Sequence, residues 1–272
     1  MSSKRTLVID GNNMSARFAN AYVLTTSNGV LSGVVYGILY FIRRFLKRKT
    51  PYQYHRIIYA FDSPKVVEFR RELYPEYKSQ REQQRKKRKS LENFYYSYLV
   101  QTETLKRVLP KLNIIPLILP GYEADDAVYK IIKALPDEEF VIYSNDKDFH
   151  QMISKRVVVA KPHHKLPKEN YIDKKPKYFL IQRALQGDAS DNIKGVPQIG
   201  EKRAQQIVDE VGEKKLSLFL QNIHKCPKYH ERLEEHKGVI RRNYRLMSLS
   251  YAYKTYTSGI KGIYAVSYTH LT

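Results

Sequence analysis

Three short runs rich in Val, Ile, Tyr and Phe each stop at an aspartate, and this pattern constrains the fold more than any other feature of the chain. The runs are Thr6–Asp10, Arg56–Asp62 and Glu139–Asp146. Runs of this composition, separated by helix-like segments, are typical of buried strands in a mainly parallel sheet. Ligands of such open sheets bind beyond the carboxyl ends of the strands. We therefore predict an α/β fold with Asp10, Asp62 and Asp146 on one edge, although a single strand-ending Asp is usually only a turn or helix cap.

A second acidic group opens the segment 121–132. The apolar residues Ala127, Val128, Ile131 and Ile132 have helical spacing. This spacing predicts a helix with Glu123, Asp125 and Asp126 in its first turn. Carboxylates there could simply complement the helix dipole, but they could also reach toward one point beyond the helix end.

The remaining acids lie in two turns. Asp148 follows Asp146 by two residues, and Asp188 and Asp191 occur in Gly-Asp-Ala-Ser-Asp-Asn. The whole set of nine is Asp10, Asp62, Glu123, Asp125, Asp126, Asp146, Asp148, Asp188 and Asp191. So many converging carboxylates would repel one another and lose their charge unless cations neutralised them. Oxygen ligands with no His or Cys at matching spacing favour Mg²⁺ or Mn²⁺ over zinc.

The charge balance indicates the partner. Lys and Arg number 48 against 27 Asp and Glu, which gives a net charge of +21. A balance this basic indicates a polyanion, most simply nucleic acid, with an anionic membrane as the weaker alternative and a merely basic surface as the simplest one. A basic surface that holds phosphates around an acidic metal pocket predicts a divalent-metal-dependent nuclease.

The chain carries no sign of export or membrane insertion. Its one cysteine, Cys226, cannot form an internal disulfide, which suits a reducing cytosol. The apolar start Thr6–Ile9 is too short for a signal core. The most apolar window, Val34–Leu46, is interrupted by two arginines and has the spacing of a buried helix face. We expect a cytoplasmic protein with no membrane partner.

Six motifs in order resemble one family, the structure-specific 5′ nucleases. The motifs are IDGNNMSAR (9–17), AFD (60–62), YPEYKSQR (74–81), GYEADD (121–126), SNDKD (144–148) and GDASDNIKGVPQIGEKRA (187–204). They are most similar to those of the bacteriophage flap endonucleases and 5′→3′ exonucleases, and of the 5′ nuclease domain that precedes some bacterial DNA polymerases. The resemblance covers about residues 4–252, and none of the acidic positions departs from it.

The resemblance implies a domain plan and a ligand set. A PIN-like α/β core would span residues 1–175 with an inserted helical arch near 75–109. A helix-hairpin-helix-type DNA-binding region would span 176–258 with its hairpin at 193–204, and the tail 259–272 resembles no element of the family and could be non-native. One ion would be held by Asp10, Asp62, Glu123 and Asp125, with Asp126 adjacent. The other would be held by Asp146, Asp148, Asp188 and Asp191, as in two-metal hydrolysis with ions about 4 Å apart.

The arch segment is basic. Residues 76–109 contain no Gly or Pro and are rich in helix formers. A charge run is usually a solvated face, but like charges this dense favour a segment that becomes ordered on a polyanion. The resemblance implies that Lys78 and Arg81 steer the scissile phosphate, and Arg85 is a further candidate for DNA contact. Tyr77 is a candidate for stacking on a base, and a packed tyrosine is the equal alternative.

The second DNA element is the hairpin Ile193–Ala204. Tight glycine turns before a helix present backbone N–H groups to a phosphate, and an ordinary helix–turn–helix packing unit is the alternative. The candidate contacts are Gly195, Val196, Gly200, Lys202 and Arg203. The family resemblance also implies a K⁺ ion at this hairpin. Neither element has residues placed to read bases, so we expect recognition of structure rather than sequence.

These observations predict a 5′ nuclease that cuts flaps, recessed 5′ ends or RNA primers during replication or repair. The expected partners are branched DNA with a free 5′ end, an RNA–DNA hybrid and other replication proteins, and the expected state is a monomer. The resemblance to phage enzymes suggests a viral gene that acts in a bacterial cytoplasm. Two alternatives remain: a compact metal-dependent RNase, and a non-catalytic scaffold that binds branched DNA.

Overall fold

The computed structural model describes residues 4–21, 24–47, 53–63, 68–80, 89–161, 171–173 and 176–256. Two compact units divide these residues. Unit 1 comprises residues 4–63 and 89–173, and unit 2 comprises residues 68–80 and 176–256. Unit 2 is therefore assembled from two separate stretches of the sequence, because the residues that precede the arch helix pack with the C-terminal region.

The core of unit 1 is a six-stranded sheet among the described residues, in the order β3-β2-β1-β4-β5-β6. Its strands are β1 (Arg5–Asp10), β2 (Arg56–Phe61), β3 (Ile115–Ile118), β4 (Glu139–Tyr143), β5 (Val157–Ala160) and β6 (Tyr171–Ile172). All neighbours are parallel except β6, which runs antiparallel to β5. The mainly parallel α/β sheet predicted from the strand-like runs is confirmed. All three runs contain a strand, although β4 ends at Tyr143, three residues before Asp146.

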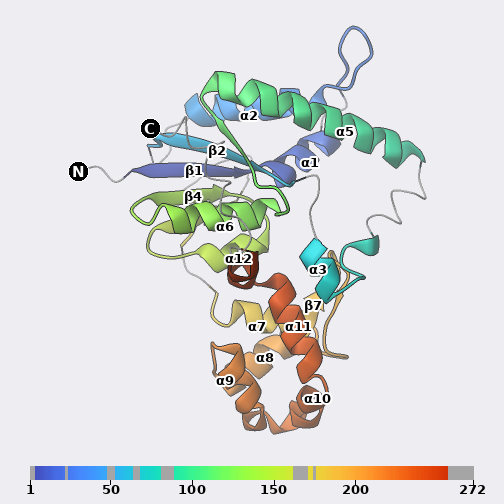
Figure 1. Ribbon diagram of the computed structural model, residues 1–272, viewed down its shortest axis with the longest axis vertical. Helices are drawn as coiled ribbons and strands as arrows, with labels where there is room; N and C mark the ends of the chain where they lie inside the picture. The colour runs from blue at the N-terminus through green and yellow to red at the C-terminus, as the bar shows by residue number, and fades with distance from the viewer. Residues whose placement is uncertain are drawn as a thin grey trace. The chain divides into compact units, whose positions relative to one another are not determined.

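Helices cover both faces of this sheet (Figure 1). On one face lie α1 (Gly11–Ala21), α2 (Gly33–Lys47) and α5 (Lys89–Val108), and on the other lies α6 (Ala124–Ala134). Two short 3-10 helices, η1 (Leu109–Leu112) and η2 (Lys147–Met152), complete the unit's helices among the described residues. The predicted helix at Val34–Leu46 is α2, whose residues Ile38, Ile42 and Phe45 are buried. Of the predicted arch, α5 is helical, and residues 81–88 lie outside the described residues.

The topology brings three strand ends to one edge. Strands β1, β2 and β4 are parallel neighbours, so their carboxyl ends meet there. Asp10 is the last residue of β1, and Asp62 directly follows β2. Gly11 lets α1 begin at once, because a Cβ at this position would lie 2.3 Å from the Ala60 carbonyl oxygen of β2.

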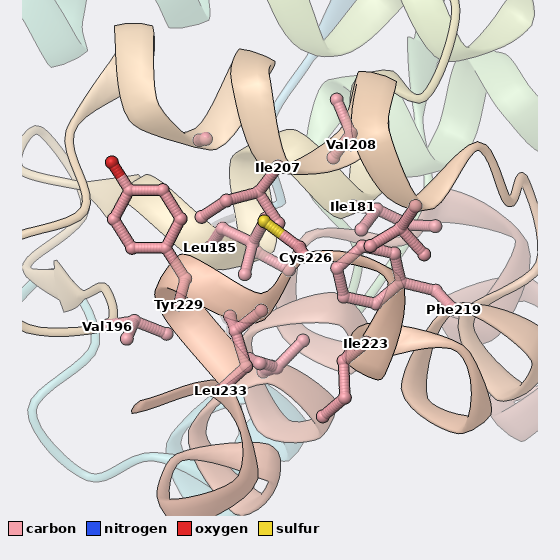
Figure 2. Packing of buried hydrophobic residues seen from close by; sticks show 14 of the residues in the cluster. Ile181, Leu185, Val196, Ile207, Val208, Phe219, Ile223, Cys226, Tyr229 and Leu233 are labelled. Carbon is pink, nitrogen blue, oxygen red and sulfur yellow. The ribbon is translucent and has the colours of Figure 1, made fainter. Parts of the chain in front are cut away.

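Unit 2 is helical among its described residues, apart from one two-stranded ribbon. Its elements are α3 (Glu68–Leu73), α7 (Phe179–Gln186), β7 (Gly187–Asp188), β8 (Ile193–Lys194), α8 (Glu201–Val211), α9 (Leu216–Gln221), η4 (Ile223–Lys225), η5 (Pro227–Tyr229), α10 (His230–Glu235), α11 (Lys237–Met247) and α12 (Leu249–Tyr256). Its core gathers Leu185, Ile207, Phe219 and Leu233 from four of these elements and Cys226 from the junction of η4 and η5 (Figure 2). This core packs α8 against α7, α9 and α10.

No helix within the described part of the chain is long and apolar enough to cross a membrane. The interpretation of Val34–Leu46 as a buried helix face rather than a membrane span agrees with this result.

Candidate metal centre and nucleic-acid interface

Asp10 is the buried anchor of the sheet edge. Its carboxylate accepts hydrogen bonds from Ser144 Oγ (2.5 Å) and from the Asn13 backbone N–H (3.1 Å). The pKa of Asp10 is raised to about 7, chiefly by burial and also by the nearby carboxylates of Asp146 and Asp62, while the two hydrogen bonds act to lower it. Asp10, Asp62 and Asp146 therefore interact electrostatically, as their positions at three neighbouring strand ends predict.

A second carboxylate group lies at the N-terminus of α6. Glu123 is the N-cap rather than a first-turn residue, so the prediction that all three acids lie in the first turn is correct only for Asp125 and Asp126. The Ala124 N–H donates to Asp62 Oδ1 (2.8 Å), which joins the end of β2 to this helix. Asp125 and Asp126 accept backbone bonds from Asp126 (2.8 Å) and Glu123 (3.3 Å) respectively. These backbone N–H groups orient the carboxylates at the start of the helix.

These three acids could hold a cation. Glu123, Asp125 and Asp126 each offer one carboxylate oxygen, and the three oxygens lie within 4.8 Å of one another. The donors are all carboxylate oxygens, a set that fits a hard divalent ion such as Mg²⁺ or Mn²⁺. The residues present therefore fit the type of metal that the sequence predicts.

Ser144 links two of the predicted acids. Its Oγ donates to Asp10 and accepts from the backbone N–H of Asp146 (2.9 Å). Asp146 in turn caps η2, because its Oδ1 accepts the Asp148 N–H (2.8 Å). One hydroxyl thus ties the end of β1 to the loop after β4. Ser144 stands within the SNDKD motif, but its bridging role could not be predicted from the motif alone.

Asp188 belongs to unit 2 and has different surroundings. Its Oδ2 lies 2.5 Å from Arg183 Nη2, and its Oδ1 accepts from the Ser190 backbone (2.8 Å) and hydroxyl (2.7 Å). Burial acts to raise the pKa of Asp188, but the bonds from Ser190 and the Arg183 charge outweigh it and lower the pKa. Arg183 could not be predicted from the sequence, since a basic residue five positions before Asp188 on a helix forms no motif of its own.

Asp191 connects the second acidic turn to the start of the arch segment within unit 2. Its backbone carbonyl accepts from the Lys78 N–H (2.9 Å), and its carboxylate accepts from the Tyr77 hydroxyl (3.2 Å) and lies 4.0 Å from Lys78 Nζ. Asn192 donates to the Glu76 carbonyl (2.9 Å). Lys78 has a left-handed backbone (φ 56°), a conformation that non-glycine residues rarely adopt. The structure therefore brings the predicted residues Tyr77, Lys78 and Asp191 together.

Tyr77 is packed rather than exposed. Its ring is 2% accessible and lies among Tyr74, Ile193, Leu246 and Met247. This is the packed arrangement that the sequence left open beside base stacking. The other arch candidates, Arg81 and Arg85, lie outside the described residues.

The second set of predicted metal ligands is shared between the units. Asp146 and Asp148 belong to unit 1, whereas Asp188 and Asp191 belong to unit 2. A shared ion for these four residues stays a prediction.

The hairpin turn joins β8 to α8. Val196 is buried, and its N–H donates to the Leu185 carbonyl (2.8 Å). Gly195 packs so closely on α7 that a Cβ would lie 2.3 Å from the Gln186 backbone. Gly200 is the N-cap of α8, and a Cβ there would meet nothing within 4 Å. Glycine is thus required at position 195 by close packing on α7. At Gly200 the open space leaves the backbone of the helix N-terminus accessible to a ligand.

The two predicted cations at the start of α8 are exposed. Arg203 Nη1 donates to the Gln198 carbonyl (2.6 Å). Gln198 itself has a left-handed backbone conformation, with a φ of 61°. Lys202 is the next residue toward the helix N-terminus. Both cations therefore stand within the first turn of α8, where a bound phosphate would also be favoured by the helix dipole.

Family models cover nearly all of the described chain. Residues 5–178 match the model described as 5′-3′ exonuclease, N-terminal resolvase-like domain, and residues 174–258 match 5′-3′ exonuclease, C-terminal SAM fold. The chain belongs to the 5′-3′ exonuclease family. The family suggested by the six motifs is thereby confirmed.

Named relatives agree with this assignment. A 5′-3′ exonuclease of Aquifex aeolicus is 32% identical over 218 residues, which cover 77% of this chain and 70% of that protein. The thermostable DNA polymerase I of Thermus filiformis is 33% identical over 215 residues, covering 77% of this chain. That alignment takes in 24% of the polymerase, so the chain spans about a quarter of its length.

Solved structures share the fold. A bacteriophage T5 5′-exonuclease with bound zinc superposes with a TM-score of 0.70 at 23% identity, covering 92% of this chain and 91% of that one. The T5 flap endonuclease in a pseudo-enzyme-product complex with DNA and metal ions gives a TM-score of 0.67 at 23% identity, covering 92% and 90%. The α/β core and the C-terminal helical region are therefore arrangements known from solved proteins.

Proposed function

We propose that this chain is a Mg²⁺-dependent structure-specific 5′ nuclease that hydrolyses phosphodiester bonds at 5′ flaps and recessed 5′ ends. The observation that carries the proposal is the gathering of carboxylates from β1, β2, α6 and the loop after β4 around one edge of a parallel sheet. Family membership and the fold shared with a flap endonuclease that binds DNA and metal ions support the same activity.

The proposed ligands of a first ion are Asp10, Asp62, Glu123 and Asp125. When bound, divalent ions would supply an activated water and would stabilise the leaving oxygen of the phosphodiester. Asp126 has a supporting position, since its carboxylate accepts the Glu123 N–H and so orients the start of α6. Mn²⁺ is expected to substitute for Mg²⁺ because both accept oxygen ligands.

Asp146, Asp148, Asp188 and Asp191 are the proposed ligands of the second ion, and the predicted basic and hairpin residues have proposed roles toward the substrate. Lys78 and Arg81 would attract the scissile phosphate, and Arg85 would contact the 5′ strand. The hairpin residues Gly195, Val196, Gly200, Lys202 and Arg203 would hold the backbone of the duplex, with K⁺ as a candidate ion there. A 5′ strand of RNA, replication proteins as partners, a monomeric state and action in a bacterial cytoplasm belong to the same proposal.

One assay separates this proposal from its alternatives. The protein is incubated with a 5′-labelled flap duplex, a nicked duplex or single-stranded RNA, each with Mg²⁺ or with EDTA. We expect short 5′ products from the flap only when Mg²⁺ is present. Cleavage confined to the RNA would indicate a compact RNase, and binding of the flap without any cleavage would indicate a scaffold.

A further inference from the structure

A cavity of about 770 Å³ opens in unit 2 beside the hairpin turn. Gln198 of the turn and Arg203 of α8 line one side, and Lys228, Tyr229 and Arg232 of η5 and α10 line the other. Tyr229 lies at the border of the core, with its hydroxyl directed away from the aliphatic side chains (Figure 2). The cavity therefore has one wall in the hairpin and another in a region to which none of the six motifs extends.

Two guanidinium groups of this cavity are anchored on the same turn. Arg203 Nη1 donates to the Gln198 carbonyl (2.6 Å), and Arg232 Nη1 donates to Gln198 Oε1 (2.6 Å) and the Pro197 carbonyl (3.4 Å). In both arginines these bonds use only Nη1, among the residues that the structure describes. The Nε and Nη2 donors of two oriented guanidinium groups thus remain for a further acceptor.

The cavity has a small excess of positive charge, and its two guanidinium groups stand apart from its carboxylates. Arg203, Lys228 and Arg232 are cationic at neutral pH, while Glu231 and Glu235 are the acidic residues of its lining. Within the described part of the chain, no carboxylate lies within 4.0 Å of either guanidinium. Buried or anchored guanidinium groups without a carboxylate partner suit phosphate, whose oxygens match the planar N–H fork.

We propose that this cavity is a second phosphate site for the backbone of duplex nucleic acid, formed by Arg203, Arg232 and Lys228. This inference rests on the proposed function and extends the contact beyond the hairpin. A backbone that lies on the exposed turn residues Pro197 and Gln198 continues onto the cavity, because the same two residues anchor Arg232. The site recognises no base, so it adds affinity and orientation for any duplex sequence.

The test measures the affinity of the full chain for the flap duplex in EDTA, where cleavage is blocked, at 50 to 200 mM KCl. The variants are Arg232→Gln and Lys228→Gln, and Lys214→Gln is the matched control because Lys214 is exposed in the same unit but does not line the cavity. Each cavity variant should lower the slope of log affinity against log salt by about 0.9, the amount expected for one lost phosphate contact. Lys214→Gln should keep the slope of the parent protein.

Two controls separate binding from folding and from small anions. Lys228 makes no hydrogen bond to the turn among the described residues. Lys228→Gln therefore removes a positive charge from the cavity without loosening the turn. Thermal melting in 5 mM inorganic phosphate tests whether the cavity binds free phosphate instead of the phosphates of a nucleic-acid backbone. Unchanged slopes for both cavity variants would overturn the proposal, as would phosphate stabilisation that Arg232→Gln removes without any change in DNA affinity. Failure of the flap to be cut, with these slopes as expected, would refute the nuclease and leave the second phosphate site standing.

Discussion

Asp10 in unit 1 and Asp188 in unit 2 each end a strand, yet their surroundings act on them in opposite directions. Asp10 is buried beside two other carboxylates, and its pKa is raised to about 7. Asp188 is held by Ser190 and by the Arg183 guanidinium, and its pKa is lowered. The positive charge of the Arg183 side chain neutralises Asp188. Asp10, in contrast, has hydrogen bonds only from a hydroxyl and a backbone N–H among the described residues.

This difference separates two uses of an acidic residue. At Asp188 the pair with Arg183 satisfies the carboxylate without any ligand, as in a structural ion pair. At the sheet edge, an added divalent cation would lower the free energy of the ionised state of Asp10 and its neighbours. The comparison therefore assigns the stronger need for metal to unit 1. Four predictions can break or sharpen it.

The largest expected effect is on cleavage by the sheet-edge acids. Asp146→Asn should lower the rate of flap cleavage at least about a thousandfold, because removal of a ligand charge weakens the stabilisation supplied by metal. Flap affinity in EDTA should change less than about twofold. Asp137→Asn, an exposed acid just before β4, is the matched control and should cut normally. An equal loss of binding by Asp146→Asn would make Asp146 a structural residue.

The second prediction concerns the stability of the metal-free protein. Because the folded pKa of Asp10 is raised from 3.8 to about 7, the folded state binds more protons between these values, and the contribution of Asp10 to stability falls as pH rises through that window. Asp10→Asn, which has no such charge, should therefore be more stable than the parent protein at pH 8 in EDTA, by on the order of 3 kcal/mol. At pH 4.5 most of the difference should vanish.

Urea denaturation at the two pH values measures this effect. Added Mg²⁺ at pH 8 should stabilise the parent protein and leave Asp10→Asn nearly unchanged, since ligand binding stabilises only a protein that retains the site. A stability difference that is the same at both pH values would show that Asp10 titrates normally and that the comparison with Asp188 is wrong.

The third prediction tests Lys78. Lys78→Ala should slow flap cleavage by about a hundredfold if the ammonium group stabilises charge on the scissile phosphate. Lys78→Gly removes the same charge and relieves the left-handed backbone (φ 56°), so the two variants should cut equally slowly while the glycine variant is more stable. Lys214→Ala, at an exposed lysine of the same unit outside the hairpin, should cut nearly normally. A normal rate for Lys78→Ala would mean that the arch assignment is wrong.

The smallest expected effect is at the ion pair of Asp188. Arg183→Met should destabilise the protein by about 2 kcal/mol, because the partly buried carboxylate loses a charged hydrogen-bond partner. A double-mutant cycle with Asp188→Asn isolates the pair, and the double variant should lose less than the sum of the single losses. Additive losses would show that Arg183 does not neutralise Asp188.

The sequence predicted the sheet and its acidic edge well for a physical reason. The nearly continuous apolar composition of a run such as Thr6–Asp10 indicates a strand that is buried on both faces. Parallel pairing of such strands then brings their carboxyl ends to the same edge of the sheet. The packing of Tyr77 could not be decided in the same way, because exposed and buried tyrosines have the same local pattern in a chain with 23 of them. The pair of Arg183 and Asp188 and the bridging role of Ser144 depend on side-chain directions that only the folded chain defines. The cavity wall formed by η5 and α10 could not be predicted, because Lys228 and Arg232 stand among ordinary surface charges.

An anomalous difference map from a crystal soaked in Mn²⁺ tests the central claim most directly. The account predicts a peak at the carboxyl edge of β1 and β2, within about 2.2 Å of carboxylate oxygens drawn from Asp10, Asp62, Glu123 and Asp125. A protein that cleaves the flap in Mn²⁺ but shows its metal peak away from these residues would contradict the account.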